Sequence, residues 1–242
     1  SSIMQERSHA FAMKSQIWLL DPRPNIPAIV NAVKTGFELS EASNTPVMLQ
    51  IGIRSCHLHG QFETSDNVRA KYTPKDAIEN PYRDIDRIVL PPASFLHEEE
   101  KITKRWPAAV EYIQQNYLNE FFFGKEKNIG IILQGGFYNN VIRALEKLGV
   151  SDIYGESDIP LYVLNVTYPL VDEELESFCK SKDAVLVIEQ GQPNFIEQNI
   201  ASIFKQREIA TELHGKDLLP LAGEYNAKTL IKGISQFLGQ YD

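Results

Sequence analysis

The second half of the chain alternates short apolar runs with stretches of helical period, and this alternation constrains the fold more than any other feature. Runs at Asn128–Gln134, Leu161–Val166 and Ala184–Glu189 predict buried strands. A helix is predicted from about Tyr138 to Leu148, where Gly149 provides a stop signal. Strands buried on both faces and alternating with helices are typical of a parallel sheet with right-handed crossovers. The sequence therefore predicts an α/β fold with a mostly parallel sheet flanked by helices.

The first part of the chain shows the same alternation in a shorter form. It predicts a strand at Gln16–Leu20, a helix at Ile26–Glu41 and a strand at Pro46–Ile53. The helical period places four residues on one face: Ile29, Val33, Phe37 and Ser40. A βαβ unit of about 40 residues buries too little surface to be stable alone. We therefore expect it to pair with a partner sheet, either the rest of a truncated domain or the second half of this chain.

The middle of the chain separates these two parts. Residues 61–94 are polar and punctuated by proline, which indicates a linker, and Phe95–Phe123 follows a helical period that Pro107 starts or kinks. The sequence thus predicts three regions: a partial βαβ unit (1–60), a linker with a helical connector (61–126) and an α/β domain (127–242).

Composition limits the class of protein. The chain has 24 Lys and Arg against 32 Asp and Glu, a net charge of −8, which argues against nucleic-acid and anionic-membrane partners. The two cysteines, Cys56 and Cys179, cannot form a disulfide framework, which indicates a reducing, cytoplasmic compartment. No apolar run approaches the roughly 18 residues of a membrane-spanning helix, and we expect no signal peptide. Because the chain opens at Ser1 instead of methionine, we expect an internal fragment of a longer protein.

The densest group of reactive side chains follows the predicted strand Pro46–Ile53 and runs from Arg54 to His59. If that strand continues, His57 and His59 share one face and Cys56 lies on the other. The two histidines could bind zinc with a distant carboxylate, and Cys56 could act as a nucleophile beside a base. The simpler interpretation is a hydrogen-bonded domain edge.

Two further candidates lie at the carboxyl ends of predicted strands. Gly135 and Gly136 precede a helix N-terminus that could hold a phosphate, although their spacing matches neither common phosphate-binding motif, and a tight turn explains them as well. Glu189 closes a strand at the sheet edge where α/β proteins usually place their sites, so it could be a base, a ligand anchor or an interface cap. The sequence contains no complete Ser/His/Asp, metal-binding or phosphate-loop motif.

An ordered series of short motifs resembles indolepyruvate:ferredoxin oxidoreductase, a thiamine-dependent 2-oxoacid:ferredoxin oxidoreductase family. Six segments of the first part of this chain resemble the end of that family's pyrimidine-type domain: Ser1-Ser2, Gln5-Glu6-Arg7-Ser8-His9-Ala10-Phe11-Ala12, Leu20-Asp21-Pro22, Gly36-Phe37-Glu38-Leu39-Ser40-Glu41, Pro46-Val47-Met48-Leu49 and Arg54-Ser55-Cys56-His57. Segments of the second half of this chain resemble the family's transketolase C-terminal-like domain: Gly135-Gly136, Leu145-Glu146-Lys147-Leu148-Gly149, Thr167-Tyr168-Pro169-Leu170, Val187-Ile188-Glu189-Gln190-Gly191, Phe195-Ile196-Glu197, Gly215-Lys216-Asp217-Leu218-Leu219-Pro220 and Gly223-Glu224-Tyr225.

The resemblance implies a parent enzyme that oxidatively decarboxylates aryl 2-oxoacids such as indolepyruvate to acyl-CoA, with ferredoxin as electron acceptor. It also implies thiamine diphosphate, Mg²⁺, [4Fe–4S] clusters and coenzyme A in that parent. The chain has no Gly-Asp-Gly motif and no four-cysteine run, so we expect none of these cofactors within it. The family often shows paired glutamates where this chain has Glu189-Gln190, so no role that requires both carboxylates is expected.

Together these observations imply a structural and interface segment that is inactive alone and packs against the cofactor-bearing domains, in a parent that forms a homo-oligomer. No catalytic, cofactor-binding or metal residue is expected. The residues expected at a domain interface or an anion site are Arg54, His57, Gly135, Gly136, Tyr168, Pro169 and Glu189. The alternative is a free-standing α/β module that binds an anion or nucleotide at the Gly135-Gly136 helix N-terminus.

Overall fold

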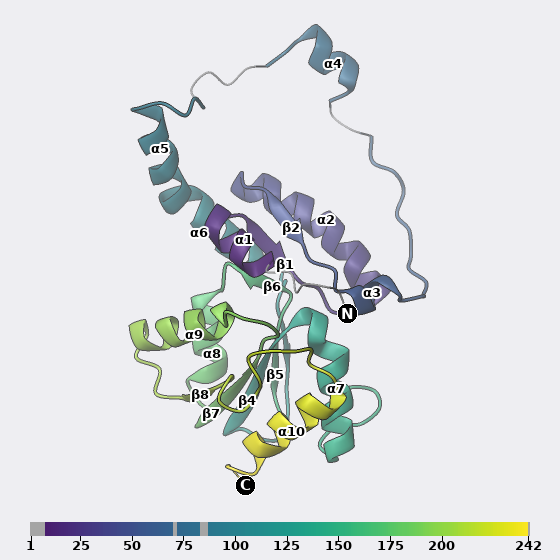
Figure 1. Cartoon of the computed structure of the whole chain (residues 1–242). Helices are drawn as coiled ribbons and strands as arrows, with labels where there is room; N and C mark the ends of the chain where they lie inside the picture. Colours follow the sequence, from purple (N-terminus) through teal and green to yellow (C-terminus); the bar gives the residue numbers. More distant parts are fainter. Residues whose placement is uncertain (1–7, 70–71, 83–86, 242) are drawn as a thin grey trace.

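The computed structural model describes residues 8–69, 72–82 and 87–241, so the motif residues 1–7 lie outside the described residues. Figure 1 shows a larger sheet below and a smaller one above, both flanked by helices. The larger sheet is parallel except for one antiparallel strand, β3, at its edge. The predicted α/β class, a mostly parallel sheet flanked by helices, is confirmed. In order across the sheet, the strands are β3 (Glu120–Phe122), β5 (Leu161–Leu164), β4 (Ile129–Gln134), β7 (Ala184–Ile188) and β8 (Glu212–His214).

Helices cover both faces of the larger sheet. Helices α7 (Tyr138–Leu148) and α10 (Ala227–Leu238) pack on one face, and α8 (Asp172–Cys179) and α9 (Phe195–Gln206) pack on the other. Consecutive residues of the central strand β4 alternate between the two cores: Ile131 and Leu133 contribute to the first and Ile132 to the second. Every residue of β4 and β7 is buried, as expected for strands inside a parallel sheet.

The smaller sheet joins the two halves of the chain. Strands β1 (Trp18–Leu20) and β2 (Val47–Leu49) are parallel and connected by α2 (Ile26–Ser43), which gives the predicted βαβ unit. Strand β6 (Val166–Tyr168), from the second half, pairs antiparallel with β1. Helices α1 (Ser8–Ser15) and α6 (Trp106–Gln115) contribute to the same core. The second half of the chain therefore supplies a partner strand, one of the two predicted sources.

The predicted strand Leu161–Val166 is divided at Asn165. Residues before it form β5 of the larger sheet, and residues after it form β6 of the smaller one. The Asn165 side chain stabilises this crossing: its Oδ1 accepts a hydrogen bond from the Arg23 backbone N–H at 3.0 Å, and its Nδ2 donates to the Leu118 carbonyl at 2.9 Å. Asn165 is thus one of the polar residues that link the two sheets.

Helix α2 buries a different face from the one that Ile29, Val33, Phe37 and Ser40 share. Its buried residues are Ala32, Thr35, Leu39 and Ser43, whereas Val33 is 47% and Phe37 72% exposed. The small side chains on the buried face let α2 approach β2 and α6 closely, and a Cβ at Gly36 would lie 3.6 Å from the Val47 side chain. In the part of the chain that the structure describes, no helix, α2 included, is long and apolar enough to cross a membrane.

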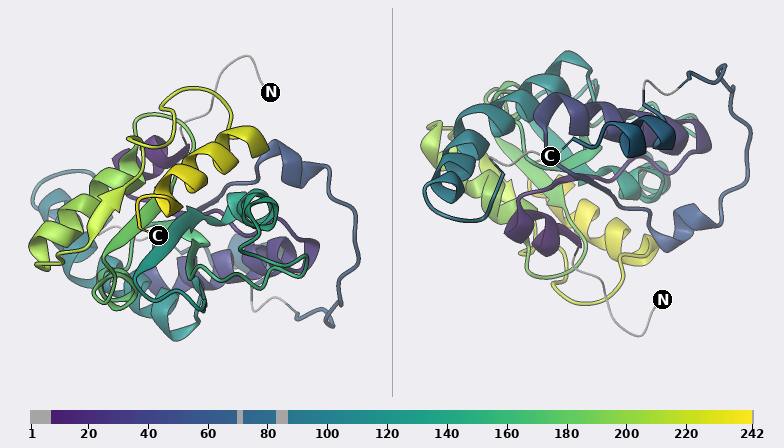
Figure 2. Two further views of the ribbon diagram at one scale, coloured as in Figure 1. Left: turned by 90° about the horizontal axis from the view of Figure 1, so that it is seen from below. Right: turned by 90° about the horizontal axis from the view of Figure 1, so that it is seen from above.

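The connector also differs from its prediction. The expected helix Phe95–Phe123 consists of α5 (Ala93–Glu100), a π-helical turn η1 (Lys101–Arg105) and α6, which ends at Gln115. The chain then turns at Tyr117, where φ is +50°, and enters β3, because pairing with β5 satisfies its backbone. The linker carries the short helix α4 (Pro74–Glu79) and extends away from the body as an arm (Figure 2). The division into regions 1–60, 61–126 and 127–242 remains a prediction.

Candidate functional site

The two glycines at the start of the β4–α7 connection lie against Asp21, the residue that follows β1. Gly135 and Gly136 begin the 3₁₀ turn η2 (Gly135–Phe137). A Cβ at Gly135 would lie 2.0 Å from the Asp21 carbonyl oxygen, and a Cβ at Gly136 would lie 2.6 Å from Asp21 Oδ1. Contacts this short leave no room for a side chain. At Gly135 the obstacle is the Asp21 backbone, and at Gly136 it is the Asp21 carboxylate.

The Asp21 carboxylate occupies the place predicted for an anion. It is 3% exposed, and the Gly136 backbone N–H donates a hydrogen bond to it. Negative charge at a helix N-terminus is favourable because the first N–H groups of a helix lack partners within it. The predicted anion position therefore holds a carboxylate from the same chain.

Gln134, the last residue of β4, links this carboxylate to the end of β7. Its Nε2 donates to Asp21 Oδ2 at 3.4 Å, and its Oε1 accepts a hydrogen bond from the Gln190 backbone N–H at 3.0 Å. Gln134 is buried, so both ends of its amide group need partners. The carboxyl ends of β1, β4 and β7 thus belong to one buried polar network.

Glu189 caps helix α9 from outside the helix. Its Oε1 accepts from the Ile196 N–H and its Oε2 from the Glu197 N–H, each at 3.1 Å. Asn194 stands at the N-cap position of α9, but its side chain makes no capping hydrogen bond. Lys216 Nζ donates to the Glu189 carbonyl and, at 2.7 Å, to the Tyr225 hydroxyl. Glu189 thus satisfies the start of a helix of the same chain. The roles of base, ligand anchor or interface cap remain predictions.

Burial raises the pKa of both carboxyl groups to about 7. For Asp21 the loss of hydration dominates, and the hydrogen bond from Gly136 opposes it. For Glu189 burial again dominates, opposed by the N–H groups of Ile196 and Glu197 and by the charge of Lys216. Burial also lowers the pKa of the Lys216 ammonium. Both carboxyl groups therefore change charge near neutral pH.

Tyr168 and Pro169 lie where β6 meets the N-terminal part of the chain, next to the junction between the two sheets. Tyr168, in β6, is 8% exposed, and its ring meets the Trp106 ring edge-on at a centroid distance of 5.4 Å. The Trp18 ring lies 6.2 Å from it. Pro169 follows Tyr168 through a cis peptide bond. These two residues therefore lie at a contact between the two halves of this chain.

Arg54 and His57 lie elsewhere. The strand predicted to continue to Ile53 ends at Leu49, because its partner β1 ends at Leu20, and Ile53–Cys56 forms helix α3. The shared strand face expected for His57 and His59 is therefore absent, and both residues are exposed at the start of the arm. Cys56 is exposed in α3. The side chain of Arg54 lies outside the described residues.

Three contributors to the network were not predicted from the sequence: Asp21, Gln134 and Lys216. Asp21 and Gln134 could have been found, since each stands at the carboxyl end of a predicted strand, where side chains of neighbouring strands meet. Lys216 lies in a loop after β8 and has no local signal. Its position depends entirely on how β7 and the C-terminal segment pack.

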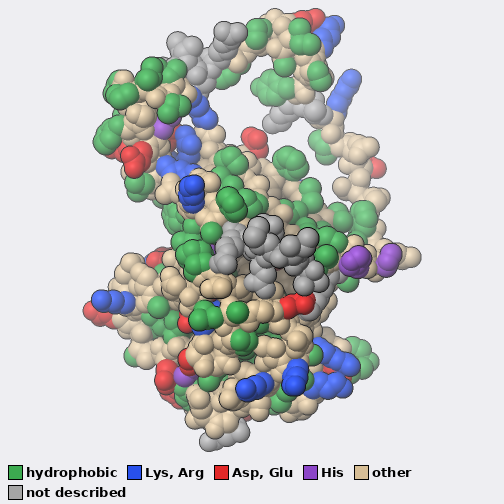
Figure 3. Space-filling model, in the orientation of Figure 1, with side chains coloured by type: hydrophobic (Ala, Val, Ile, Leu, Met, Phe, Trp, Pro, Cys, Tyr) green, Lys and Arg blue, Asp and Glu red, His purple; other side chains and the backbone are tan. Residues whose placement is uncertain are grey.

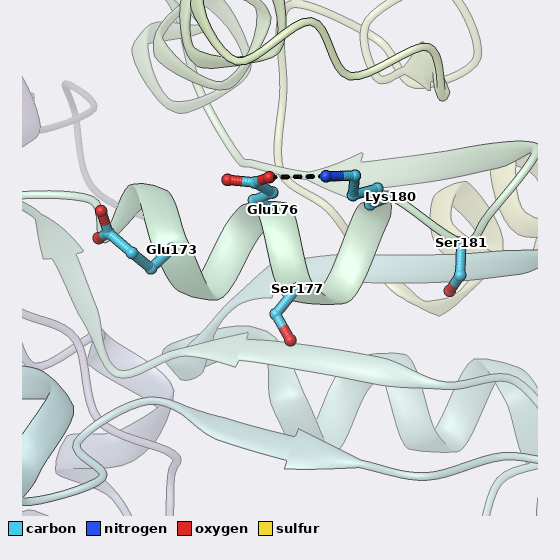
Figure 4. Close-up of a pocket in the computed structure, with 5 residues that line it drawn as sticks. All are labelled: Glu173, Glu176, Ser177, Lys180 and Ser181. Atoms are coloured by element: carbon cyan, nitrogen blue, oxygen red, sulfur yellow. Dashed lines mark hydrogen bonds and ion pairs between the residues drawn. The ribbon is translucent and has the colours of Figure 1, made fainter.

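A hollow on the outer surface of α8 is unrelated to this network. It is lined by Glu173, Glu176, Ser177, Lys180 and Ser181, and Figure 4 shows Ser177 pointing away from the ion pair between Glu176 and Lys180. The Nζ of Lys180 lies 3.1 Å from Oε1 of Glu176. No nucleophile, base and orienting group converge here, so the hollow offers no catalytic arrangement.

The residues at the junction do not fit the cofactors implied for the parent enzyme. A diphosphate needs free backbone N–H groups, but at this edge Gly136 donates to Asp21, and Ile196 and Glu197 donate to Glu189. Among residues 8–69, 72–82 and 87–241, no three His, Cys, Asp or Glu side chains converge as metal ligands. The two cysteines cannot supply the four thiolates that a [4Fe–4S] cluster needs.

Comparison with known proteins shows which family this chain resembles. Residues 120–238 match the indolepyruvate oxidoreductase domain. The chain is 27% identical to the indolepyruvate oxidoreductase subunit IorA of Methanothermobacter thermautotrophicus over 242 residues, which cover 99% of this chain and 37% of that protein. It is also 27% identical to IorA of Pyrococcus abyssi over 249 residues, covering 99% of this chain and 36% of the relative. The predicted resemblance is confirmed.

The chain thus spans little more than a third of the curated relatives it matches. Two solved structures are similar in part. A 2-oxoglutarate:ferredoxin oxidoreductase from Magnetococcus marinus gives a TM-score of 0.43 at 15% identity, covering 60% of this chain and 23% of the other. A split-gene transketolase, an inactive β4 tetramer, gives 0.48 at 12% identity, covering 92% of this chain and 57% of the other.

Replacing Gly136 with alanine tests the close approach. We expect Gly136→Ala to lower the free energy of unfolding by about 1–3 kcal/mol, because the new Cβ displaces the Asp21 carboxylate. In an Asp21→Ala background the same change should cost much less. Urea unfolding of the four variants of this cycle measures the coupling. Gly52→Ala is the matched control, since no atom lies within 4 Å of a Cβ there, and equal costs in both backgrounds would contradict the account.

The raised pKa values predict a pH dependence. Between about pH 4 and 7 the folded chain retains protons on Asp21 and Glu189 that the unfolded chain has released. The contribution of these groups to the free energy of unfolding is therefore complete below about pH 4 and is lost as pH rises to about 7. Asp21→Asn should remove about half of this fall, because an amide stays neutral and still accepts from Gly136.

Urea unfolding at pH 5, 6, 7 and 8 measures the slope of the free energy of unfolding against pH. Asp66→Asn, at an exposed position of the arm, serves as the control and should leave the slope unchanged. A slope that is the same in the Asp21→Asn variant and in the original chain would show that Asp21 does not titrate in this range.

Proposed function

We propose that the chain is part of an oxidoreductase that oxidatively decarboxylates aryl 2-oxoacids such as indolepyruvate to acyl-CoA, with ferredoxin as electron acceptor. The match of residues 120–238 to the indolepyruvate oxidoreductase domain carries this proposal. Nearly the whole chain also aligns with IorA subunits of two organisms. Thiamine diphosphate, Mg²⁺, [4Fe–4S] clusters and coenzyme A would act in the remainder of that enzyme.

Within this enzyme we assign these residues a structural role. The polar groups at the carboxyl edge of the sheet bond to one another: Asp21 to Gly136, Gln134 to Asp21 and Gln190, and Glu189 to the start of α9. Groups bonded in this way hold two halves of a chain in a fixed arrangement and leave few donors for a substrate. This supports a segment that holds the cofactor-bearing parts of the enzyme in register and is inactive alone. We further propose that the parent enzyme is a homo-oligomer.

The alternative of an anion-binding module is less well supported. Its strongest feature is the helix N-terminus at Gly135-Gly136, where the Gly136 N–H already donates to Asp21. An external anion would have to displace a carboxylate that is covalently part of the site and therefore present at high effective concentration.

The assembled oxidoreductase and the isolated chain should differ in activity. We expect the assembly to reduce a viologen dye when indolepyruvate and coenzyme A are both present. The isolated chain should show no dye reduction and no saturable binding of thiamine diphosphate in calorimetry. Dye reduction or thiamine diphosphate binding by the isolated chain would contradict the structural role. If the assembly reduced no dye in the presence of any aryl 2-oxoacid, the activity proposed for the parent enzyme would be contradicted.

A further inference from the structure

Four side chains form a hydrogen-bonded series near the C-terminal end of the chain. His214, the last residue of β8, is 7% exposed. Its Nδ1 lies 2.6 Å from Asp217 Oδ2, and its Nε2 lies 2.7 Å from the Tyr241 hydroxyl oxygen. That hydroxyl donates to Glu212 Oε2 at 2.7 Å. We call this series the C-terminal network; its members are Asp217, His214, Tyr241 and Glu212.

The network attaches the residues that follow helix α10 to the edge of the larger sheet. Tyr241 lies after α10, whereas Glu212 and His214 belong to the edge strand β8. The Tyr241 ring also lies 5.4 Å from the Phe237 ring, centroid to centroid. Burial, the hydrogen bond to Glu212 and, less strongly, the charge of Asp183 raise the pKa of Tyr241 to about 12, so the phenol keeps its proton. Figure 3 shows acidic side chains on the lower left of the molecule, in the region where Figure 1 draws β8.

A count of protons limits the states in which the network can exist. Each hydrogen bond contains one proton, so the three contacts need three protons. A neutral imidazole supplies one proton and the Tyr241 hydroxyl supplies a second, which leaves one contact without a proton. An imidazolium supplies two, because both of its ring nitrogens are donors. The three contacts are therefore satisfied together only when the network holds one extra proton.

The surrounding groups place this extra proton on His214. Burial alone would raise the pKa of Asp217, but the hydrogen bonds from the Gly215 N–H and from His214 outweigh burial and lower it. The Glu212 side chain is 62% exposed, so water stabilises its charged form. In the closed network an imidazolium therefore lies between two carboxylates: its Nδ1–H donates to Asp217, and its Nε2–H donates to the Tyr241 oxygen.

We propose that the C-terminal network is a pH-sensitive latch, which is closed while His214 is an imidazolium and opens when this residue loses a proton. Histidine is the side chain that normally changes charge between about pH 5 and 8. The carboxylate of Asp217 retains the proton on Nδ1, so Nε2 becomes an acceptor. The single Tyr241 proton then serves either His214 or Glu212, and one of these bonds is lost.

Opening also removes an ion pair, because Nε2 of His214 lies 3.6 Å from Glu212 Oε1 and only the imidazolium is charged. The latch therefore holds the end of the chain on β8 at mildly acidic pH and loosens it as pH rises. The inference uses only residues of this chain and does not depend on the proposed function.

Nitrogen-15 NMR of the full chain tests the proposal. Both ring nitrogens of His214 should carry protons at pH 5.5, and Nε2 alone should lose its proton as the pH is raised to 8.5. Over the same range the backbone order parameter of Tyr241 should fall from about 0.85 to below about 0.6. His57 and His59, exposed on the arm, report the titration of histidines outside the network. A Tyr241 backbone that stays equally rigid while His214 titrates would overturn the proposal.

Matched variants separate a latch from a histidine that titrates without consequence. Glu212→Gln supplies the missing proton, because its amide can accept from Tyr241 at pH 5.5 and donate to it at pH 8.5. Residue 241 should therefore stay rigid at both pH values in this variant. Tyr241→Phe removes the bridging hydroxyl and should leave residue 241 mobile at both.

The control for these variants is Glu208→Gln, which makes the same change of charge at an exposed position outside the network. It should keep the full pH response of Tyr241. A Glu212→Gln variant that also keeps the full response would show that the proton count does not govern the attachment, and would overturn the proposal. None of these measurements uses a substrate, so their outcomes are distinct from those that test the proposed function.

Discussion

The approach of Asp21 to Gly135 and Gly136 is the contact on which the arrangement of the two sheets depends. A backbone carbonyl and a carboxylate from the end of β1 lie where any other residue would place a side chain. Neighbouring polar bonds reinforce this contact: Asn139 Nδ2 donates to the Pro24 carbonyl at 3.0 Å, and Arg23 forms an ion pair with Glu120 at 2.5 Å. Since β6 also pairs with β1, the smaller sheet is attached to the larger one by both backbone and side chains.

Two buried carboxylates at this junction illustrate a balance of opposing effects. Burial disfavours their charged forms, while hydrogen bonds from helix N-termini favour them, and the outcome is a pKa of about 7 for each. Each carboxylate satisfies donors at a helix start that would otherwise bind water or a ligand. The same geometry thus predicts that the junction is sensitive to pH and leaves little room for an external anion.

Local sequence signals predicted the larger domain well. Helix α7 matches its predicted bounds from Tyr138 to Leu148, and Gly149 ends it in the left-handed conformation that glycine tolerates. The strands of the central sheet were recognisable because apolar runs buried on both faces have few alternative structures.

Features that depend on long-range packing were less predictable. Val33 and Phe37 follow a helical period as a core stripe would, yet the small residues on the other side of α2 face the sheet. Periodicity identifies an apolar face and cannot tell which neighbour will cover it. Similarly, the Gly135-Gly136 turn was recognisable as a potential anion site, but only the fold reveals that Asp21, more than a hundred residues earlier, fills it.

The central claim is that the N-terminal unit and the larger α/β domain form one cooperative structure joined at Asp21. The chain contains only two tryptophans, Trp18 and Trp106, and both belong to the core of the smaller sheet, so their fluorescence reports on that unit alone. Far-ultraviolet circular dichroism reports on the helices of both parts of the chain. Urea unfolding followed by both signals should give superimposable transitions with one midpoint. A fluorescence transition at clearly lower urea would show that the smaller unit unfolds by itself and would contradict the account.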